Sequence, residues 1–246
     1  MNLDPSLRPR DRILNAAAAL LAEHGREGVS TRSVSALAGV QPQTIYRQYG
    51  DMRGLLNAVA QSGFAAYIEA KAGQGSSEDP VADFRHGWDM HVDFALRNPA
   101  LYALMYGDPR PGLESATSDI EAALGGVLRR VALAGALRAG VARATQQVLA
   151  ANVGVALTLL AAQSRGDRVG IDSEVSVDTR EMLVGWLMNE GDGGPIVGSG
   201  DSGSATAAAS AAALGASLSA VEDRFSNGEL ALLGELLNRI GGDISG

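Results

Sequence analysis

Three short helix-forming segments, each closed by a glycine, occupy the first 50 residues of this sequence and constrain its fold more than any other feature. In the first segment, residues 11–24, the apolar positions lie one, three or four apart and form one helical stripe, and Gly25 follows as a stop. Ser30 is a good N-cap for a second helix, which Gly39 ends after two turns. The spacing predicts two helices joined by a short connection.

A third and a fourth segment follow directly. Pro42 stands where the first turn of a helix tolerates proline, and that helix is expected to run to Tyr49, where Gly50 breaks it. Asp51 suits both the N-cap and the positive end of the dipole of a longer fourth helix, which is expected to reach about Ala72. Three short helices within about 40 residues, the second and third joined by a tight turn, predict a helix-turn-helix unit.

The rest of the chain is also predicted to be helical, which makes the fold class all-α. Runs of β-branched and aromatic residues with period-two alternation do not occur, whereas alanine, leucine and arginine dominate long stretches. The glycine- and serine-rich residues 191–204 are expected to form a flexible linker. Further helices are expected at residues 81–97, 100–106, 113–135, 140–165, 174–190 and 205–224, and after the capping-box pair Ser226 and Glu229.

Composition and charge exclude several classes of protein. The chain has no cysteine, so it has neither a disulfide framework, nor a thiolate metal site, nor a cysteine nucleophile. Its net charge is −8, but residues 1–56 hold seven arginines against five acids, a balance of +2, and the remainder holds 13 basic against 23 acidic residues, a balance of −10. A mildly basic N-terminal part is expected when only that end meets an anion. No signal peptide and no 18-residue, uncharged, strongly apolar run are apparent, so we expect a cytoplasmic protein without a membrane partner.

Several motifs occur together between residues 13 and 60, ILNAAAALLAEHGREGVSTRSVSALAGVQPQTIYRQYGDMRGLLNAVA. After the helix that stops at Gly25 and the capped short helix come the run Ala38-Gly39-Val40, the run Thr44-Ile45-Tyr46-Arg47, the aromatic Tyr49 and the pair Leu55-Leu56. This combination resembles the N-terminal domain of the TetR family of bacterial transcriptional regulators. The resemblance implies a DNA-binding repressor, a homodimer, whose helical C-terminal domain binds a small ligand and thereby releases the operator.

With this resemblance the chain divides into four parts. They are a helix-turn-helix DNA-binding domain at residues 1–56, a helical ligand-binding and dimerisation domain at 57–190, the flexible linker at 191–204 and a C-terminal helical extension at 205–246. The sequence itself supports a dimer, because the helices at 140–165 and 174–190 carry broader apolar faces than one thin helical layer hides. Burial of these faces inside one subunit is the alternative.

The expected DNA contacts follow from the geometry of a helix-turn-helix. The first residues of its recognition helix face base edges in the major groove, and the preceding helix crosses the phosphate backbone. Gln43 and Thr44 are at that tip, where glutamine pairs with adenine and the threonine methyl contacts thymine, and Arg47, one turn on, reaches guanine or phosphate. The other predicted contacts are Ser30, Thr31, Arg32, Gln41, Tyr46, Tyr49 and Arg53.

Some of these assignments have alternatives. Tyr46 or Tyr49 can instead pack in the small core. A flexible arm with Arg8, Arg10 and Arg12 is expected to add phosphate contacts, or else to be a solvated tail.

Two positions depart from the family pattern. Gln41 stands where the family usually has serine or threonine, and Met52 stands where it usually has a lysine. Methionine cannot hold a phosphate. The adjacent Arg53 lies about 100° further round the helix and is the candidate substitute for that lysine.

Aromatic and polarisable side chains gather in the helices that are expected to surround the core of the C-terminal domain. They suit a pocket or a hydrophobic core, so core packing is the alternative for each of them. The candidate ligand contacts are Trp88, His91, Tyr102, Met105, Tyr106 and Trp186. Gln146, Asn152 and Gln163 are expected to orient a ligand if they face inward. The acidic surroundings leave room for a cationic or a neutral ligand.

The sequence offers little for catalysis. His86 and His91 are five residues apart and so about 140° apart on a helix, which is poor for sharing a metal. The GxGxxG pattern at residues 198–203 lies in the linker with no strand before it. We therefore expect no enzyme activity, no cofactor and no metal site. The alternative function is a helical interaction protein whose tail, residues 205–246, docks a protein partner.

Overall fold

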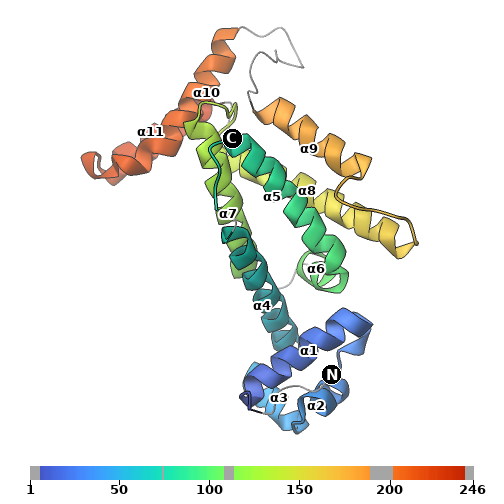
Figure 1. The fold of residues 1–246 in the computed structure, drawn as a ribbon. Coiled ribbons are helices and arrows are strands. Elements are labelled where there is room, and N and C mark those ends of the chain that lie inside the picture. The colour runs from blue at the N-terminus through green and yellow to red at the C-terminus, as the bar shows by residue number, and fades with distance from the viewer. Residues whose placement is uncertain (1–5, 74, 108–113, 189–201, 242–246) are drawn as a thin grey trace. The chain divides into compact units, whose positions relative to one another are not determined.

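In the computed structural model, residues 6–73, 75–107, 114–188 and 202–241 are described, and within these ranges the chain forms eleven α-helices and no strand (Figure 1). The predicted all-α fold class is therefore confirmed. The helices form two compact units. The first unit comprises residues 1–73 and 94–119, and the second comprises residues 74–93 and 120–246.

Most helices form close to their predicted bounds. The first unit contains α1 (Pro9–His24), α2 (Thr31–Ala38), α3 (Pro42–Tyr49), α4 (Met52–Ala72) and α6 (Pro99–Tyr106). The second contains α8 (Val141–Ser164), α9 (Glu174–Leu187), α10 (Ser202–Ser217) and α11 (Asn227–Ile240), while α5 (Pro80–Arg97) and α7 (Glu114–Leu133) have residues in both. The predicted linker mostly lies outside the described residues, but its last three residues, 202–204, belong to α10.

The first helix starts earlier than predicted and takes in the expected arginine arm. Pro9 occupies its first turn, where the fixed φ of proline is already helical. Arg10 and Arg12 therefore lie in α1 rather than on a flexible arm, and Arg8, the N-cap residue, pairs with Asp11 at 2.9 Å. The buried side of α1, which packs on α2, α3 and α4, consists of Ile13, Ala16, Ala17 and Leu21.

The connection from α2 to α3 has the local chemistry that the sequence predicted. The Ser30 hydroxyl accepts a hydrogen bond from the Ser33 amide at 3.1 Å, and the Ser33 hydroxyl accepts one from the Ser30 amide at 2.9 Å. Gly39 ends α2 with a φ of 62°, a left-handed conformation that glycine adopts at little cost. Pro42 then opens α3. We call α1, α2 and α3 the head.

The fourth helix continues without a break across the predicted domain boundary at residue 56. Asp51 caps it, because its Oδ1 atom accepts a hydrogen bond from the Gly54 amide at 2.7 Å. α4 packs against α1, α3 and α6. The head therefore forms one compact unit together with α4 and α6, and the compact units are not divided where the sequence-based domains are.

In the second unit, α8 and α9 pack against each other and each leaves a face exposed. The exposed positions of α8 include small residues one turn apart, among them Ala150 and Gly154. On α9 the exposed residues are large and apolar, since Met182 is 61% and Trp186 is 52% exposed. Large apolar side chains grouped on a surface commonly mark an interaction site.

The length and composition of α8 would allow it to cross a membrane, contrary to the expectation that no such run exists. The helix packs against α9, however, and its buried side includes the polar residues Thr145 and Asn152. A core helix of a folded domain passes the same test of length and composition, so this helix is weak evidence for a membrane span.

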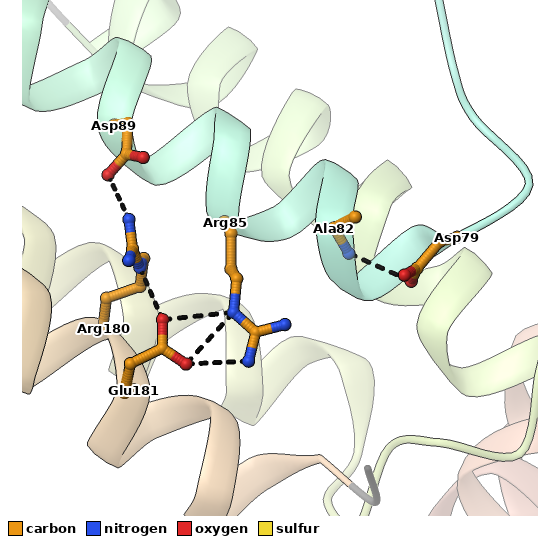
Figure 2. Close-up of polar contacts among 6 residues, drawn as sticks. All are labelled: Asp79, Ala82, Arg85, Asp89, Arg180 and Glu181. Atoms are coloured by element: carbon orange, nitrogen blue, oxygen red, sulfur yellow. Dashed lines mark hydrogen bonds and ion pairs between the residues drawn. The ribbon is translucent and has the colours of Figure 1, made fainter.

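A network of ion pairs joins α5 to α9 (Figure 2). Glu181 accepts hydrogen bonds from Nε of Arg85 at 3.0 Å and from Nη2 of Arg85 at 2.7 Å. Arg180 donates to Asp89 at 2.5 Å and to Glu181 at 2.8 Å. Each arginine thus meets a carboxylate on the other helix, which fixes the position of α9 along α5.

This network is expected to make the protein less stable in acid. Hydrogen bonds from Arg85 hold the pKa of Glu181 below its ordinary value, and the hydrogen bond from Arg130 does the same for the pKa of Asp83 on α5. A carboxylate whose pKa is lowered by folding stabilises the protein above its unfolded-state pKa, and that contribution is lost as the pH falls through the folded-state pKa. The free energy of unfolding should therefore fall below about pH 4.5, the ordinary value for glutamate.

In the variant Glu181→Gln, the free energy of unfolding should fall less steeply over the same pH interval. Glutamine at this position takes up no proton. Urea titrations of both proteins at a series of pH values measure this difference. If the free energy of unfolding fell equally steeply with pH in the two proteins, the network would not contribute to the loss of stability in acid.

The C-terminal extension forms two helices that pack on each other. The helix α11 begins with the predicted capping box, in which the Ser226 amide donates to Glu229 at 2.8 Å. Its Leu237 is buried, and α10 buries alanines at positions 209, 211, 212 and 216. The predicted alanine-rich helix ends at Ser217, and two 3-10 turns occupy residues 218–220 and 222–224.

Candidate nucleic-acid interface

One side of α3 is buried and the other is exposed, which separates the candidate contacts from the core. Ile45 is fully buried, whereas Gln43, Tyr46 and Arg47 are exposed and Thr44 is half-buried. With 3.6 residues per turn, positions 43, 46 and 47 lie on one face. Two of the side chains predicted to contact bases, Gln43 and Arg47, are therefore presented together with Tyr46 at the surface of the head.

Tyr46 and Thr31 link α3 to the start of α2. The Tyr46 hydroxyl and the Thr31 hydroxyl lie 3.2 Å apart, and Tyr46 remains 47% exposed. Thr31 is the first residue of α2, and the first amides of a helix lack intrahelical acceptors. Arg32, the next residue, is exposed. Two hydroxyls, an arginine and a helix start thus form one polar patch, which suits the oxygen atoms of a phosphate.

Tyr49 uses its polar atom inside the head. Its hydroxyl donates to the Arg10 carbonyl oxygen at 2.8 Å, and the Arg10 guanidinium lies over its ring, 5.0 Å from the centroid. Nη1 of Arg10 also donates to the Gln48 carbonyl oxygen at 3.4 Å. Burial raises the pKa of Tyr49 above its ordinary value, although Arg10 opposes the rise. These contacts tie α1 to the end of α3 and favour the packing alternative for Tyr49.

The substitution Tyr49→Phe separates the two roles. It removes one hydrogen bond and leaves the Arg10 carbonyl without that donor, so the free energy of unfolding should fall by about 1 kcal/mol. DNA affinity should change little, because the ring and its contact with Arg10 remain. Urea denaturation and a DNA-binding titration measure the two effects. Unchanged stability with a large loss of DNA affinity would instead assign the hydroxyl to the DNA interface.

The remaining predicted contacts lie at the ends of α2, α3 and α4, and all of them are exposed. The hydroxyl of Ser30 takes part in the capping box, and Gln41 is the N-cap residue of α3 but makes no side-chain cap. Arg53 lies 3.9 Å from Asp51, and 70% of its side chain is exposed. Met52, where the family usually has lysine, is half-buried.

The predicted ligand contacts are divided between the two units. Tyr102, Met105 and Tyr106 belong to the first unit, and Trp88, His91 and Trp186 belong to the second. All but Trp186 are buried or half-buried. Trp186 lies on the exposed face of α9, away from the core of its unit. This position does not favour the ligand contact that was expected from its residue type.

Aromatic rings cluster in the first unit around the C-terminal half of α4. The ring centroids of Tyr67 and Phe94 are 4.7 Å apart, those of Phe64 and Tyr67 are 6.3 Å apart, and those of Tyr102 and Tyr106 are 4.7 Å apart. Burial raises the pKa values of Tyr67 and Tyr102 well above the ordinary value. We call these five residues the aromatic cluster. Phe64 and Tyr67 were not among the candidates, although the helical spacing of Phe64 with the buried Leu56 and Ala60 could have pointed to it.

Two buried polar side chains of the second unit differ in how they are satisfied. Trp88 is 3% exposed, and its indole N–H donates to the buried Ser176 hydroxyl at 3.1 Å. Asn152, on α8, is 5% exposed, and its Nδ2 atom has no hydrogen-bond partner among the described residues. A buried amide donor without an acceptor costs about 1–3 kcal/mol. Of the three expected orienting groups Asn152 faces inward, whereas Gln146 and Gln163 are exposed.

The described side chains bring no metal site together. Within the part of the chain that the structure describes, no group of three or more histidine, aspartate or glutamate residues is placed to hold an ion. Asp89 of α5 and Glu181 of α9 meet arginines instead (Figure 2).

Two family models match the sequence. Residues 13–59 match the model described as bacterial regulatory proteins, tetR family, and residues 84–179 match the tetracyclin repressor-like C-terminal domain. Together these matches cover more than half of the 246 residues. A comparison with curated proteins gives no match.

Solved structures with a similar fold include proteins from three bacteria. A protein of unknown function from Rhodococcus sp. RHA1 is 26% identical, with a TM-score of 0.61 over 74% of this chain and 97% of that one. The fatty acid degradation regulator FadR from Bacillus halodurans is 15% identical, with a TM-score of 0.59 over 74% and 97% of the two chains. FadR from Bacillus subtilis, in complex with stearoyl-CoA, is 16% identical, with a TM-score of 0.58 over 71% and 97%. About a quarter of this chain has no counterpart in these structures.

Proposed function

The chain belongs to the TetR family of bacterial transcriptional regulators, and from this membership we propose that it is a dimeric repressor that a small ligand releases from its operator. The observation that carries the proposal is the exposed face of α3. Gln43, Tyr46 and Arg47 lie on it, opposite the buried Ile45, in the segment that matches the family's DNA-binding model. A recognition helix needs this division between a core side and a side that enters the major groove.

In the proposed complex the residues of the head have two kinds of role. Gln43 and Thr44 read base edges, since they lie in the first turn of α3, and Arg47, one turn further on, reaches guanine or phosphate. The pair Thr31 and Tyr46, with Arg32, holds a phosphate and sets the register of the head on the duplex. Ser30, Gln41 and Arg53 flank these groups as secondary backbone contacts, and Tyr49 acts by holding α3 to α1.

The proposed dimer uses the exposed faces of α8 and α9. Met182 and Trp186 form a large apolar surface on α9, and the small residues of α8 allow another helix to approach closely. Two such helices from each protomer can pack as a four-helix bundle. A two-fold axis through this bundle would present the two heads as a related pair, as a palindromic operator requires.

For the effector we propose a small, largely apolar molecule. The aromatic cluster, with Met105 beside it in sequence, offers apolar and polarisable surface.

Control requires that the effector bind one arrangement of the heads better than the other. In the proposed mechanism the free dimer holds its two α3 helices about one DNA turn, roughly 34–36 Å, apart. The ligand moves α4 and widens this spacing. α4 suits this role, because it packs on α1 and α3 and also carries Phe64 and Tyr67 of the aromatic cluster.

An electrophoretic mobility shift with the DNA upstream of the chain's own gene tests the proposal. Sequence-specific retardation that competitor DNA of random sequence does not remove is the expected result. Non-specific binding should be weak and should fade with added salt, since the N-terminal 56 residues have a balance of only +2. Failure to retard any fragment at low salt would contradict the regulator function.

The same proposal covers the remaining expectations. As a DNA-binding regulator the protein is proposed to work in the cytoplasm without catalysing a reaction. The alternative of an interaction protein with DNA binding as a secondary property has less support, because both family models describe regulators. The proposed division of labour assigns DNA binding to the N-terminal part and ligand binding with dimerisation to the C-terminal part, with the extension as a cover for the flank of the dimer.

A further inference from the structure

A cavity of about 300 Å³ lies in the first unit where α1, α4 and α6 meet. Its apolar lining includes the buried Leu21 of α1 and Val59 of α4 and the half-buried Leu14 and Leu101. None of the five residues of the aromatic cluster lines it. The cavity is therefore a place for a ligand that the proposed effector site does not use.

Small side chains make room for this cavity. Ala18 of α1, Gly63 and Ala66 of α4 and Ala100 of α6 line it. A Cβ atom on Gly63 would lie only 2.5 Å from Cδ2 of Leu101, so glycine at this position lets α6 come close to α4.

The polar residues that line the cavity are Asn15 of α1, Ser62 of α4, Arg97 and Asn98. Arg97 is the only charged residue among those that line it, and the adjacent Asn98 is the N-cap residue of α6. Nδ2 of Asn98 donates to the Phe94 carbonyl oxygen at 2.9 Å, which holds the amide in place. The leucines and valine of the floor supply apolar surface beside this positively charged end. Complementarity in charge and polarity therefore favours an amphipathic anion.

The size of the cavity restricts that anion further. Ligand pockets in proteins are about 300–1,000 Å³, so this cavity is at the lower end of the range. We propose that it binds a short-chain aliphatic carboxylate, with the carboxylate toward Arg97 and the alkyl chain on the floor between α1 and α4.

A ligand at this position would act on the head directly. α1 packs on α4 and α6 around the cavity, and the contacts between Arg10 and Tyr49 tie α1 to α3. A molecule that fills the gap favours the arrangement of α1, α4 and α6 seen here over any arrangement in which the gap closes. Binding of the carboxylate is therefore coupled to the placement of the recognition helix.

Calorimetric titration of the full chain with sodium hexanoate tests this site, with 1-hexanol as the uncharged probe. Ala66→Phe puts a ring into the cavity and should weaken hexanoate binding at least about tenfold, since it excludes the alkyl chain. Ala65→Phe is the matched control, because Ala65 is an exposed neighbour that does not line the cavity, and binding should stay as in the unmodified chain. Arg97→Gln should weaken the binding of hexanoate several-fold, because it removes one charged contact with the carboxylate. The binding of 1-hexanol should not change.

Ala18→Phe fills the cavity from α1 and guards against a folding defect in the first variant, and thermal melting shows whether each protein is folded. Loss of hexanoate binding in a folded cavity-filled variant, with binding kept in Ala65→Phe, supports the site. The inference is overturned if the unmodified chain does not bind hexanoate at millimolar concentration, or if both folded cavity-filled variants bind it as the unmodified chain does. Because the readout is binding in the absence of DNA, either result is independent of whether the protein is a repressor.

Discussion

Replacing Arg47 by alanine is expected to weaken operator binding by about 1–3 kcal/mol for each head, which is roughly 5- to 150-fold. Arg47 is exposed on the same face of α3 as Gln43 and Tyr46, and an arginine at such a position pairs with guanine or with phosphate. Tyr46→Ala should have an effect of similar size, because it removes both the ring and the hydroxyl that lies 3.2 Å from Thr31. Fluorescence anisotropy with a labelled operator measures both.

The control for charge is Arg165→Ala. Arg165 is also exposed and lies in the second unit, between α8 and α9. Its replacement by alanine removes one positive charge from the chain, as Arg47→Ala does. Its operator affinity should equal that of the unmodified protein. Thermal melting should show all three variants folded, since none of the residues is buried. Full affinity in both Tyr46→Ala and Arg47→Ala would remove these side chains from the DNA interface.

A negative charge on the exposed face of α9 is expected to dissociate the dimer. In the proposed bundle Met182 and Trp186 become buried, and a buried, unpaired carboxylate is costly. Met182→Glu or Trp186→Glu should therefore weaken dimerisation by about 30-fold or more, in line with the effect of about 2 kcal/mol or more at interface hot spots. Operator affinity should fall with it, because one head alone reads half a site. Sedimentation equilibrium measures the dimer directly.

The extension provides a matched control for this experiment. Leu232 on α11 is 57% exposed, close to the value for Met182, but it lies outside the proposed bundle. Leu232→Glu should leave the monomer–dimer equilibrium unchanged. If Leu232→Glu dissociates the dimer and Met182→Glu does not, the extension and not α9 forms the interface.

Much of the head is predictable because local rules determine it. A serine cap at Ser30, a left-handed glycine at Gly39 and a proline at Pro42 each act within one turn of the chain, and the structure has all three where the sequence placed them. The same holds for the capping box of α11. Because the amphipathic spacing around Ile45 is equally local, the exposed face of α3 could also be expected from the sequence.

Contacts between distant residues could not be predicted in the same way. The hydrogen bond from Tyr49 to the Arg10 carbonyl spans 39 positions, and the pair of Arg85 with Glu181 spans 96. A sequence pattern carries no information on such partners, and Arg10 was therefore expected on a flexible arm. For Trp186 the residue type suits a pocket, a core or an interface equally well, and only the packing of α9 shows that the ring is exposed.

Hydroxyl-radical footprinting on the DNA upstream of the chain's own gene tests the central claim most directly, namely that two copies of α3 read one operator. The account predicts two protected windows on one face of the duplex, centred about 10–10.5 base pairs apart, and the loss of both windows with Arg47→Ala. A single window, or protection that Arg47→Ala leaves intact, would contradict it.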